Sequence, residues 1–457
     1  MNKTFLMLNI LVCSSSLSSL TASAINLKQA LEAGYENNEE IKNIKNDFLD
    51  EIEKFPEALS SFMPRISATA NASNNRLKNK SKNVNLNRPA TETERFNKSI
   101  SLEQPIFNGF SSVAALKAAQ SSFRASRGDY YAKEQEAFLK EIAVYLDCVT
   151  AREKFYISKV SVKSNTTQLE AMQEKLNLGE STETEIAATR ERLATAEANQ
   201  AIAYAEFESA KANFFKTFGV EPMNIEMPEV PNDLPKTLDS LMDIASQSNP
   251  LVDGARHKIS AAKSGENSAK GDLLPQVSLR IEGGETENKP EQTGAQIINN
   301  RSVSTTLSMT VPILSKGGAE YSKIRSAKYK TKKSVINFDN TLKEIQSKCK
   351  AYWSEYEASK FRIQASEQAV ISAEVAYEGM KQEEILGSKT IIDVLVAEER
   401  LYKAREARVD ANKGLVISAY KIKSLVGTLT AKTMKLDVKY FEPETEFKKV
   451  KLKIVGI

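Results

Sequence analysis

Two pairs of segments in this chain alternate between apolar and polar side chains, the pattern of a β-strand with one face of each kind. The first pair covers residues 66–74 and 97–107, and the second covers 276–283 and 301–313. The apolar positions of the two leading segments are Ile66, Ala68, Ala70 and Ala72, then Val277, Leu279 and Ile281. Strands of about 9–11 residues with one apolar face are typical of membrane barrels with lipid outside and water inside. We therefore predict two strand pairs, joined by exposed loops over 75–95 and 284–298.

Four strands are too few to enclose a pore, because even the smallest outer-membrane barrels use about eight. A chain with only these strands must therefore share its barrel with copies of itself. The strand pattern alone thus predicts self-association.

Each strand pair is followed by a long proline-free helical pattern, over 111–176 and then over 319–384. At a rise of ~1.5 Å per residue, either pattern would extend roughly 100 Å. A glycine turn ends each one, at Gly179 and Gly387, and a second long helix then returns. These return helices are expected over 182–217 and 389–426.

The return helices carry a coiled-coil seam in which a large side chain recurs every seven residues and a small one follows three positions later. The large positions are Ile186, Leu193, Phe207 and Phe214, then Val394, Leu401, Leu415 and Ile422. Large residues paired with small ones let helices pack side by side around a cylinder. A plain antiparallel coiled coil would carry the same heptads, so both interpretations stay open.

Most of the mature chain is an internal duplication, the kind of repeat that determines a fold. The first helix and the strand that follows it recur at an offset of 211, as Pro64 and Pro275 illustrate. The long helices recur at an offset of 208, as Gly179 and Gly387 illustrate. Each half thus contains a helix, a strand pair and two long helices. The leading helices are expected over about 27–60 and 238–270.

The repeat also predicts the domain limits. The first structural repeat covers 25–220, a proline-rich linker covers 221–237, the second repeat covers 238–430, and a C-terminal tail covers 431–457. Residues 1–24 have the basic start, apolar run and small-residue cleavage site of a secretory signal peptide. An exported chain tolerates a disulfide between Cys148 and Cys349, but nothing in their spacing demands one, and two packed thiols are the favoured alternative.

The composition excludes several classes of function. Lys and Arg number 63 against 59 Asp and Glu, so the chain is not a general binder of nucleic acid or of anionic membranes. His257 is the one histidine, which leaves no histidine-based metal site or proton relay. No phosphate-binding or dinucleotide-binding glycine motif is present, and no nucleophile lies beside a base in any recognisable pattern. We therefore expect no catalytic residue, no cofactor and no metal, and thus not an enzyme.

The tips of the two helical hairpins each carry an acid. Glu185 and Asp393 are equivalent at the offset of 208, and both follow the tip glycine closely. A ring of carboxylates at a constriction would attract cations and repel anions, and Lys389 could offset part of that charge. The alternative is that these acids are ordinary solvated charges of a hairpin end.

The chain resembles the TolC family of outer-membrane efflux and type I secretion channels over about 27–430. The resemblance is carried by the second hairpin from Leu386 through Leu395, by its continuation to Leu429, and by the Pro-Ile-Phe-Asn-Gly of 105–109. It implies a mainly α protein with a transmembrane β-barrel portion. The implied assembly is a homotrimer, with a trimeric α-barrel of coiled-coil helices in the periplasm and a shared 12-stranded β-barrel in the outer membrane of a Gram-negative cell.

The resemblance also implies partners and gate residues. The partners are a periplasmic adaptor (membrane fusion) protein, an inner-membrane transporter of the ABC, RND or MFS type, and outer-membrane lipid. Asp393 matches a constriction acid of the family, while the family's next acid is Val396 here. The family's latch between hairpins would be kept by Lys389 and Glu185, with Glu384 in place of a tyrosine. The turns at Gly179 and Gly387 are the expected adaptor contacts.

Two functions are therefore carried forward. The first is the exit duct of an efflux pump or secretion system, a passive conduit gated at its periplasmic tip. The second is a structural or adhesive coiled-coil protein of the envelope, which is not a channel. A stalk of that kind would have no use for two copies of an amphipathic strand pair.

Overall fold

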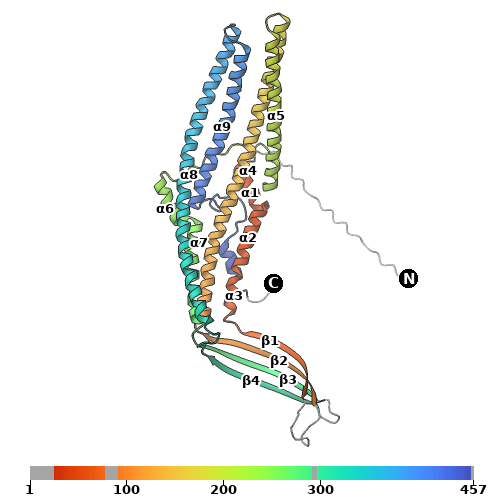
Figure 1. Ribbon diagram of the computed structural model, residues 1–457, viewed down its shortest axis with the longest axis vertical. Coiled ribbons are helices and arrows are strands. Elements are labelled where there is room, and N and C mark those ends of the chain that lie inside the picture. The colour runs from red at the N-terminus through yellow and green to blue at the C-terminus, as the bar shows by residue number, and fades with distance from the viewer. Residues whose placement is uncertain (1–24, 78–90, 291–295, 454–457) are drawn as a thin grey trace, which may run out of the picture. The chain divides into compact units, whose positions relative to one another are not determined.

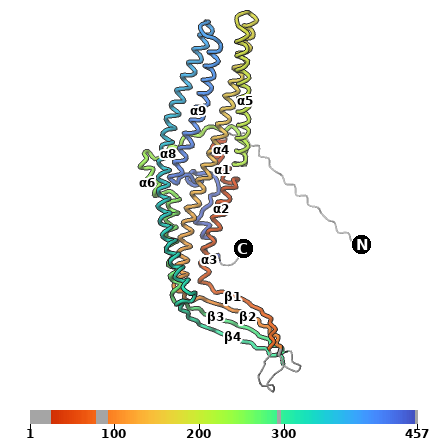
Figure 2. The backbone as a smooth tube through the Cα atoms, viewed as in Figure 1, coloured from red at the N-terminus to blue at the C-terminus, as the bar shows by residue number. Residues whose placement is uncertain are grey.

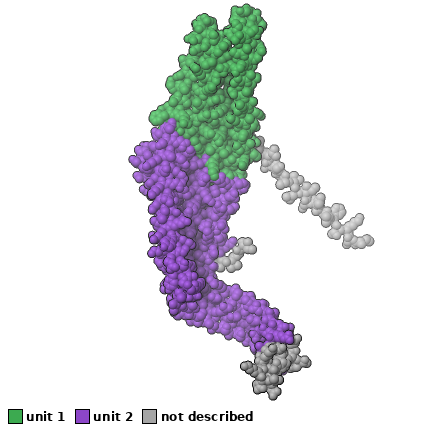
Figure 3. Space-filling model, in the orientation of Figure 1, with its two compact units in different colours: residues 1–38, 140–230, 359–417 green, residues 39–139, 231–358, 418–457 purple. Residues whose placement is uncertain are grey.

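The computed structural model describes residues 25–77, 91–290 and 296–453. The predicted signal peptide, 1–24, lies outside the described residues. Two compact units are distinguished by colour in Figure 3. Of the described residues, unit 1 holds those up to Asn38 together with 140–230 and 359–417, and unit 2 holds 39–139, 231–358 and the rest from Ser418 onward. Within the described ranges, no helix is long and apolar enough to cross a lipid bilayer.

The order of elements repeats along the chain, as the colours of Figure 1 show. The first half contains α1 (Leu27–Asn37), α2 (Glu39–Ile52), α3 (Lys54–Ser60), β1 (Arg65–Leu77), β2 (Thr91–Asn108), α4 (Ser111–Asn177) and α5 (Glu183–Phe218). The second half contains α6 (Leu238–Ser248), α7 (Pro250–Gly271), β3 (Gln276–Pro290), β4 (Ile298–Thr310), α8 (Ala319–Ile385), α9 (Ile391–Val426) and then α10 (Pro443–Val450). The helices α4 and α8 both have 67 residues, and α5 and α9 both have 36. The duplicated fold is therefore confirmed.

The single leading helix predicted in each half is wrong in detail, because both are broken at an asparagine. Asn38 and Asn249 have extended backbones, with ψ of 121° and 127°. Asn249 accepts a hydrogen bond from the Leu251 amide at 3.0 Å, and Pro250 occupies the first turn of α7. A residue before proline is driven out of the helical region, so α6 must end there. In the first half, a further break at Glu53 separates α2 from α3.

The four strands form one antiparallel sheet in the order β1-β2-β3-β4 (Figure 1). Its polar face is joined by hydroxyl pairs, including Ser67 with Ser101 at 2.9 Å and Ser278 with Ser308 at 3.1 Å. The opposite face is apolar and uncovered within the chain, since Val303 is 81% exposed. The sheet thus has the two-faced character that the alternation predicts.

The strands and loops differ in length from the prediction. Strand β1 extends to Leu77 and β2 begins at Thr91, so the exposed loop over 75–95 was drawn too long. The same holds for 284–298, because β3 extends to Pro290 and β4 begins at Ile298. Pairing continues there through polar residues that break the apolar alternation. Strand β4 was instead predicted too long at its end, because its pairing with β3 ends at Thr310 and no other described strand pairs beyond it.

Unit 2 has two apolar centres. The first joins α6, α7, α8 and α9 through Leu241, Ala245, Val252, Ile345, Cys349, Ile422 and Leu425. The second holds the C-terminal tail, where Phe447 stacks on Phe123 at 3.8 Å and Phe441 packs edge-on against Phe48 at 5.7 Å. The tail is therefore part of the folded protein.

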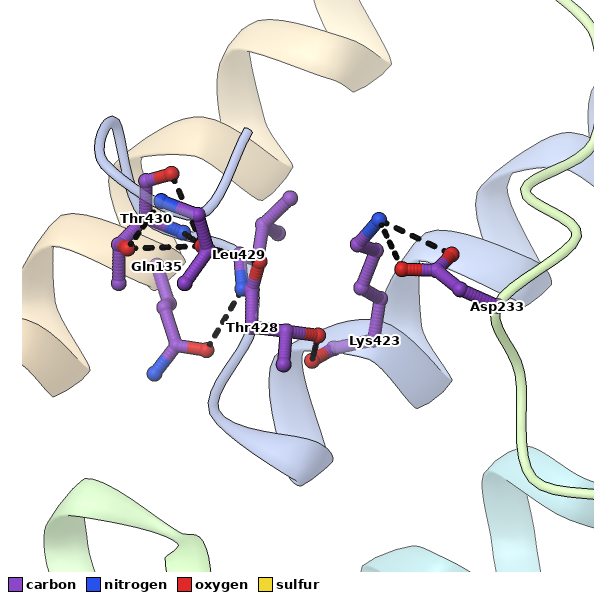
Figure 4. Close-up of polar contacts among 7 residues, drawn as sticks. Gln135, Asp233, Lys423, Thr428, Leu429 and Thr430 are labelled. Carbon is purple, nitrogen blue, oxygen red and sulfur yellow. Dashed lines mark hydrogen bonds and ion pairs between the residues drawn. The ribbon is translucent and has the colours of Figure 1, made fainter. Parts of the chain in front are cut away.

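Polar contacts hold the chain where it leaves α9 (Figure 4). The Gln135 side chain accepts a hydrogen bond from the Leu429 amide at 3.3 Å. The Lys423 ammonium pairs with Asp233 at 2.8 Å, which ties the end of α9 to the linker between the halves. The segment just before the tail is thus held on α4 through a backbone hydrogen bond.

Unit 1 is built on the long helices and encloses the start of the described chain. The Tyr145 hydroxyl lies 3.1 Å from the Ile25 carbonyl oxygen and 2.9 Å from that of Glu226. Cys148, nearby on α4, is a buried free thiol, and so is Cys349 in unit 2. Of the two alternatives for these cysteines, packed thiols are the one found.

Candidate functional site

The candidate site is the pair of hairpin tips, drawn as tubes in Figure 2. Gly179 and Gly387 both have left-handed backbones, with φ of +77° and +75°. The amide after each glycine reaches back to a carbonyl of the preceding helix, Lys175 at 2.8 Å and Glu383 at 2.9 Å. This is the glycine-terminated C-cap that reverses a helix in few residues. Both predicted tip turns are therefore present.

Glu185 takes part in a capping box at the start of α5. Its carboxylate accepts from the Thr182 amide at 2.9 Å and from the Ser181 hydroxyl at 3.0 Å. The Thr182 hydroxyl in turn accepts from the Glu185 amide at 3.3 Å. The bond from the Thr182 amide and that from Ser181 lower the pKa of the Glu185 carboxyl, so it stays ionised at neutral pH.

Asp393 occupies the equivalent position of the second hairpin. Its carboxylate accepts from the Thr390 amide at 3.0 Å and from the Thr390 hydroxyl at 2.9 Å. These bonds, with a smaller contribution from Lys389, lower the pKa of the Asp393 carboxyl. Both tip acids therefore have a local structural task in addition to their charge. The pattern of threonine followed three residues later by an acid indicated this task in the sequence.

The predicted latch residues are not joined to one another within one chain. In the part of the chain that the structure describes, Lys389 and Glu185 form no ion pair. Glu384 pairs instead with Lys175 at 2.7 Å, a contact that links α8 to α4. Glu384, which stands where the family has a tyrosine, is thus ion-paired within its own chain.

Apolar packing and further ion pairs hold the two hairpins together behind the tips. The packed residues are Met172, Ile186, Ile391, Val394 and Leu395. Farther from the tips, Arg192 of α5 pairs with Glu399 of α9 at 2.8 Å. These contacts join the first hairpin to the second, so a movement of either tip must break or carry them.

A buried acid between the hairpins was missed from the sequence. Glu398 of α9 is 2% exposed. It accepts from the Gln168 amide at 2.9 Å, from the Tyr402 hydroxyl at 3.0 Å and from the Ser164 hydroxyl. Among the described residues, no lysine or arginine pairs with it. The available signal was an acid one turn after Val394, within an apolar helix face.

A cavity of about 420 Å³ adjoins this acid in unit 1. Its lining includes Lys154, Arg192, Glu398, Glu399 and Tyr402. Burial and the Glu398 carboxylate together raise the pKa of the Tyr402 hydroxyl, which therefore stays protonated and keeps donating. The described residues contain no cluster of histidine, cysteine and carboxylate side chains that could hold a metal ion.

Comparison with known proteins decides the family. The model of the outer membrane efflux protein family matches residues 56–220 and 241–428. The chain belongs to this family. It is 24% identical over 432 residues to the outer membrane efflux protein BepC of Brucella suis, covering 94% of this chain and 91% of BepC. It is 24% identical over 419 residues to TolC of Escherichia coli, covering 89% and 83%.

Solved structures show the same fold. The CmeC outer membrane channel of Campylobacter jejuni has a TM-score of 0.73 at 17% identity, covering 94% of this chain and 90% of that one. The outer-membrane channel OprN has a TM-score of 0.72 at 16% identity, covering 88% and 89%. The predicted fold class is confirmed. Family membership also confirms the predicted efflux-channel function in the outer membrane, and the family is one of transport proteins rather than enzymes.

Proposed function

We propose that this outer membrane efflux protein is a homotrimeric exit duct whose 12 barrel strands come four from each chain. The observation that carries the proposal is the sheet, which has an uncovered apolar face and two open edges. Unpaired edges invite pairing with another chain, and only closure removes them. Three copies give an even strand number within the range of outer-membrane barrels.

The segment after β4 supports closure by a second copy. Val311 and Ile313 are both exposed, although they continue the apolar alternation of β4. The equivalent positions in the first half, Gln104 and Ile106, belong to β2, which pairs with β3 up to Asn108 apart from a bulge at Ile106. A neighbouring β1 at this edge would extend the pairing of β4 in the same way.

The tips supply the gate of the proposed duct. In a trimer, Asp393 and Glu185 contribute six ionised carboxylates at one end of the helical part. Such a ring favours cations at a constriction. A bond from Lys389 of one hairpin to Glu185 of another would then latch the closed state, while Glu384 is held by Lys175. The conduit itself performs no chemistry.

The proposed partners are a periplasmic adaptor at the turns of Gly179 and Gly387, and an inner-membrane transporter of the ABC, RND or MFS type. The names of relatives include both efflux and protein secretion. AprF of Pseudomonas aeruginosa, an alkaline protease secretion protein, is 22% identical over 344 residues, covering 74% of this chain and 70% of AprF. We infer a role in either process, with the transported compound chosen by the transporter.

The deciding experiment is purification from outer membranes in mild detergent, followed by mass determination and conductance in planar bilayers. We expect a trimer with a cation-selective pore. A monomer without conductance would overturn the proposal and favour the envelope coiled-coil alternative.

A further inference from the structure

Two helical segments of unit 2 carry opposite charge. Residues 39–60, which form α2 and α3, contain seven acidic and three basic side chains, a net charge of −4. Residues 319–350, the first part of α8, contain nine basic and three acidic side chains, a net charge of +6. The near balance of the whole chain conceals this separation.

These two segments are the ones that connect to the edges of the sheet. Strands β1 and β4 are the outer strands, and β2 and β3 are the inner ones. Helix α3 leads into β1, and β4 leads into α8. Helices α4 and α7 connect to the inner strands. If copies join edge to edge, α8 of one copy must therefore meet α2 and α3 of the next.

The inner helices show how such a pair packs. Lys258 of α7 pairs with Asp129 of α4 at 2.8 Å. The two backbones approach closely, because a Cβ on Gly128 would lie 2.6 Å from the Pro250 carbonyl oxygen and 2.9 Å from Gly254. This contact lies within one chain and needs little charge separation.

The charge of the inner pair is accordingly small. Residues 111–142 of α4 contain five basic and four acidic side chains, and α7 contains four basic and two acidic. The inner and outer pairs descend from the same repeat, yet only the outer pair is strongly and oppositely charged. The separation of charge is therefore associated with the open edges of the sheet and is not a general property of the repeated fold.

The duplication predicts which residues of the outer helices face each other. Helix α4 corresponds to α8 at an offset of 208, and α7 corresponds to α2 and α3 at an offset of −211. The close pair Gly128 and Gly254 therefore corresponds to Ile336 and Asn43. The helices are antiparallel, so going toward the sheet from this level brings Asp50 and Glu53 alongside residues 326–334. That stretch of α8 contains four lysines, at positions 328, 330, 332 and 333.

Four charges of these two faces are not ion-paired in the ranges that the structure describes. Among the described residues, Asp50 and Glu53 form no ion pair, and neither do Lys330 and Lys333. All four are exposed. Tyr329 and Ile336, on the same part of α8, are 67% and 58% exposed. The face thus has the apolar and charged residues of a protein interface, and the segments that the structure describes leave it exposed.

We propose that the acidic face of α2 and α3 docks on the basic face of α8 in the next copy, forming a charged seam at every subunit boundary. This proposal rests on the proposed trimer. It adds the charges that determine which helices, and hence which sheet edges, of two copies meet. Single exposed ion pairs contribute little, but complementary faces speed encounter and penalise wrong pairings such as acidic face to acidic face. The contact is head to tail, the kind of interface that forms a ring when the rotation between copies closes.

The test reverses charge on each face of the full-length protein and then on both. Lys330→Glu with Lys333→Glu should lower the rate of trimer assembly about tenfold at low salt, because like charges then meet. Asp50→Lys with Glu53→Lys should do the same. Combining all four substitutions should bring the rate back to within about twofold of the unchanged protein.

The matched control is Lys117→Glu with Lys263→Glu, which changes net charge equally on the inner helices and should leave assembly unchanged. Trimers that form equally fast in all variants would overturn the seam, while leaving the trimer and its conductance intact. Absence of trimers in the unchanged protein would instead overturn the proposed function. Binding of the chain to anionic phospholipid vesicles that needs Lys330 and Lys333, without rescue by the four-fold variant, would assign the basic face to lipid and also overturn the seam.

Discussion

Three carboxylates near the hairpin tips differ in what surrounds them. Glu185 and Asp393 sit in solvent and accept hydrogen bonds from the helix start just before them. Glu398 is buried and is stabilised by neutral donors alone. A buried carboxyl group without a cation nearby is costly unless its hydrogen bonds are complete. At the residue scale, the two partly exposed acids thus suit the proposed gate, whereas Glu398 belongs to the joint behind it.

The charge of Asp393 can be separated from its capping role. Asp393→Asn keeps an oxygen that can accept from the Thr390 amide but removes the negative charge. We expect a lower cation selectivity and weaker block by divalent cations, with the tip still folded. Thr390→Val, which keeps the charge and removes a capping hydroxyl, should instead loosen the tip against protease. Unchanged selectivity and block in Asp393→Asn would remove this residue from the constriction.

Glu398 offers a test of the joint. Glu398→Ala leaves the donors of Ser164, Gln168 and Tyr402 without an acceptor, which should lower the free energy of unfolding by about 2–3 kcal/mol. Faster protease cleavage near the tips should accompany this loss. The neighbouring Glu399→Ala removes only two partly exposed ion pairs, with Arg192 and Lys403, and should cost less than about 1 kcal/mol. Equal losses in the two variants would contradict a special role for Glu398.

At the element scale, periodicity was sufficient for most of the fold. The long helices were predicted to within about two residues because a period of 3.6 over many turns leaves little freedom. The breaks at Asn38 and Glu53 were missed, since apolar spacing continues across both. The strand ends were missed because their residues are mostly polar on both faces, so the sequence shows no alternation of apolar and polar side chains there.

The site was predictable only in part, and the C-terminal tail was not. The tip glycines and acids followed from the duplication. Glu398 was overlooked because its neutral partners lie far away in the sequence, on α4. The packing of Phe441 and Phe447 depends on the surface left by α2 and α4, which no local pattern of the tail describes.

The attachment of the tail should depend on pH through Glu134 of α4. This carboxyl is buried, and burial raises its pKa from 4.5 to about 7, although it accepts from the Ala431 amide. The folded protein therefore holds a proton that the unfolded chain releases between those values. Stability from this group is present below pH 4.5 and falls as the pH rises to 7, by about 3 kcal/mol.

Glu134→Gln keeps an acceptor for the Ala431 amide and cannot ionise. We expect its stability, measured by thermal unfolding in detergent, to exceed that of the unchanged protein at pH 7 and to match it near pH 4.5. Glu136→Gln, on the exposed side of the same helix, should show no such difference. A constant gap between Glu134→Gln and the unchanged protein across this range would show that Glu134 is not the titrating group.

At the scale of the whole molecule, the internal pairing of β2 with β3 indicates how two copies should pair. Within the chain, Ser101 lies opposite Glu282. In the duplication, β2 corresponds to β4 at an offset of 207, and β3 corresponds to β1 at an offset of −211. Ser101 therefore corresponds to Ser308 of β4, and Glu282 to Asn71, here in the β1 of a neighbouring copy. Both belong to the polar face of the sheet. Opposed residues of an antiparallel pair have Cα atoms about 4.5–5.5 Å apart, within the range of a disulfide.

Ser308→Cys with Asn71→Cys, in a chain whose Cys148 and Cys349 are replaced by serine, should therefore crosslink between copies on mild oxidation. Each copy offers one cysteine to either neighbour, so a closed ring of three gives covalent dimers and trimers on denaturing gels and no longer ladder. Moving the second cysteine to Ala70 places it on the opposite face, because side chains alternate along a strand. That variant should stay monomeric on the same gel. Efficient crosslinking with Ala70 and none with Asn71 would mean that the edges pair in another register, and no crosslinking in either would contradict a shared barrel.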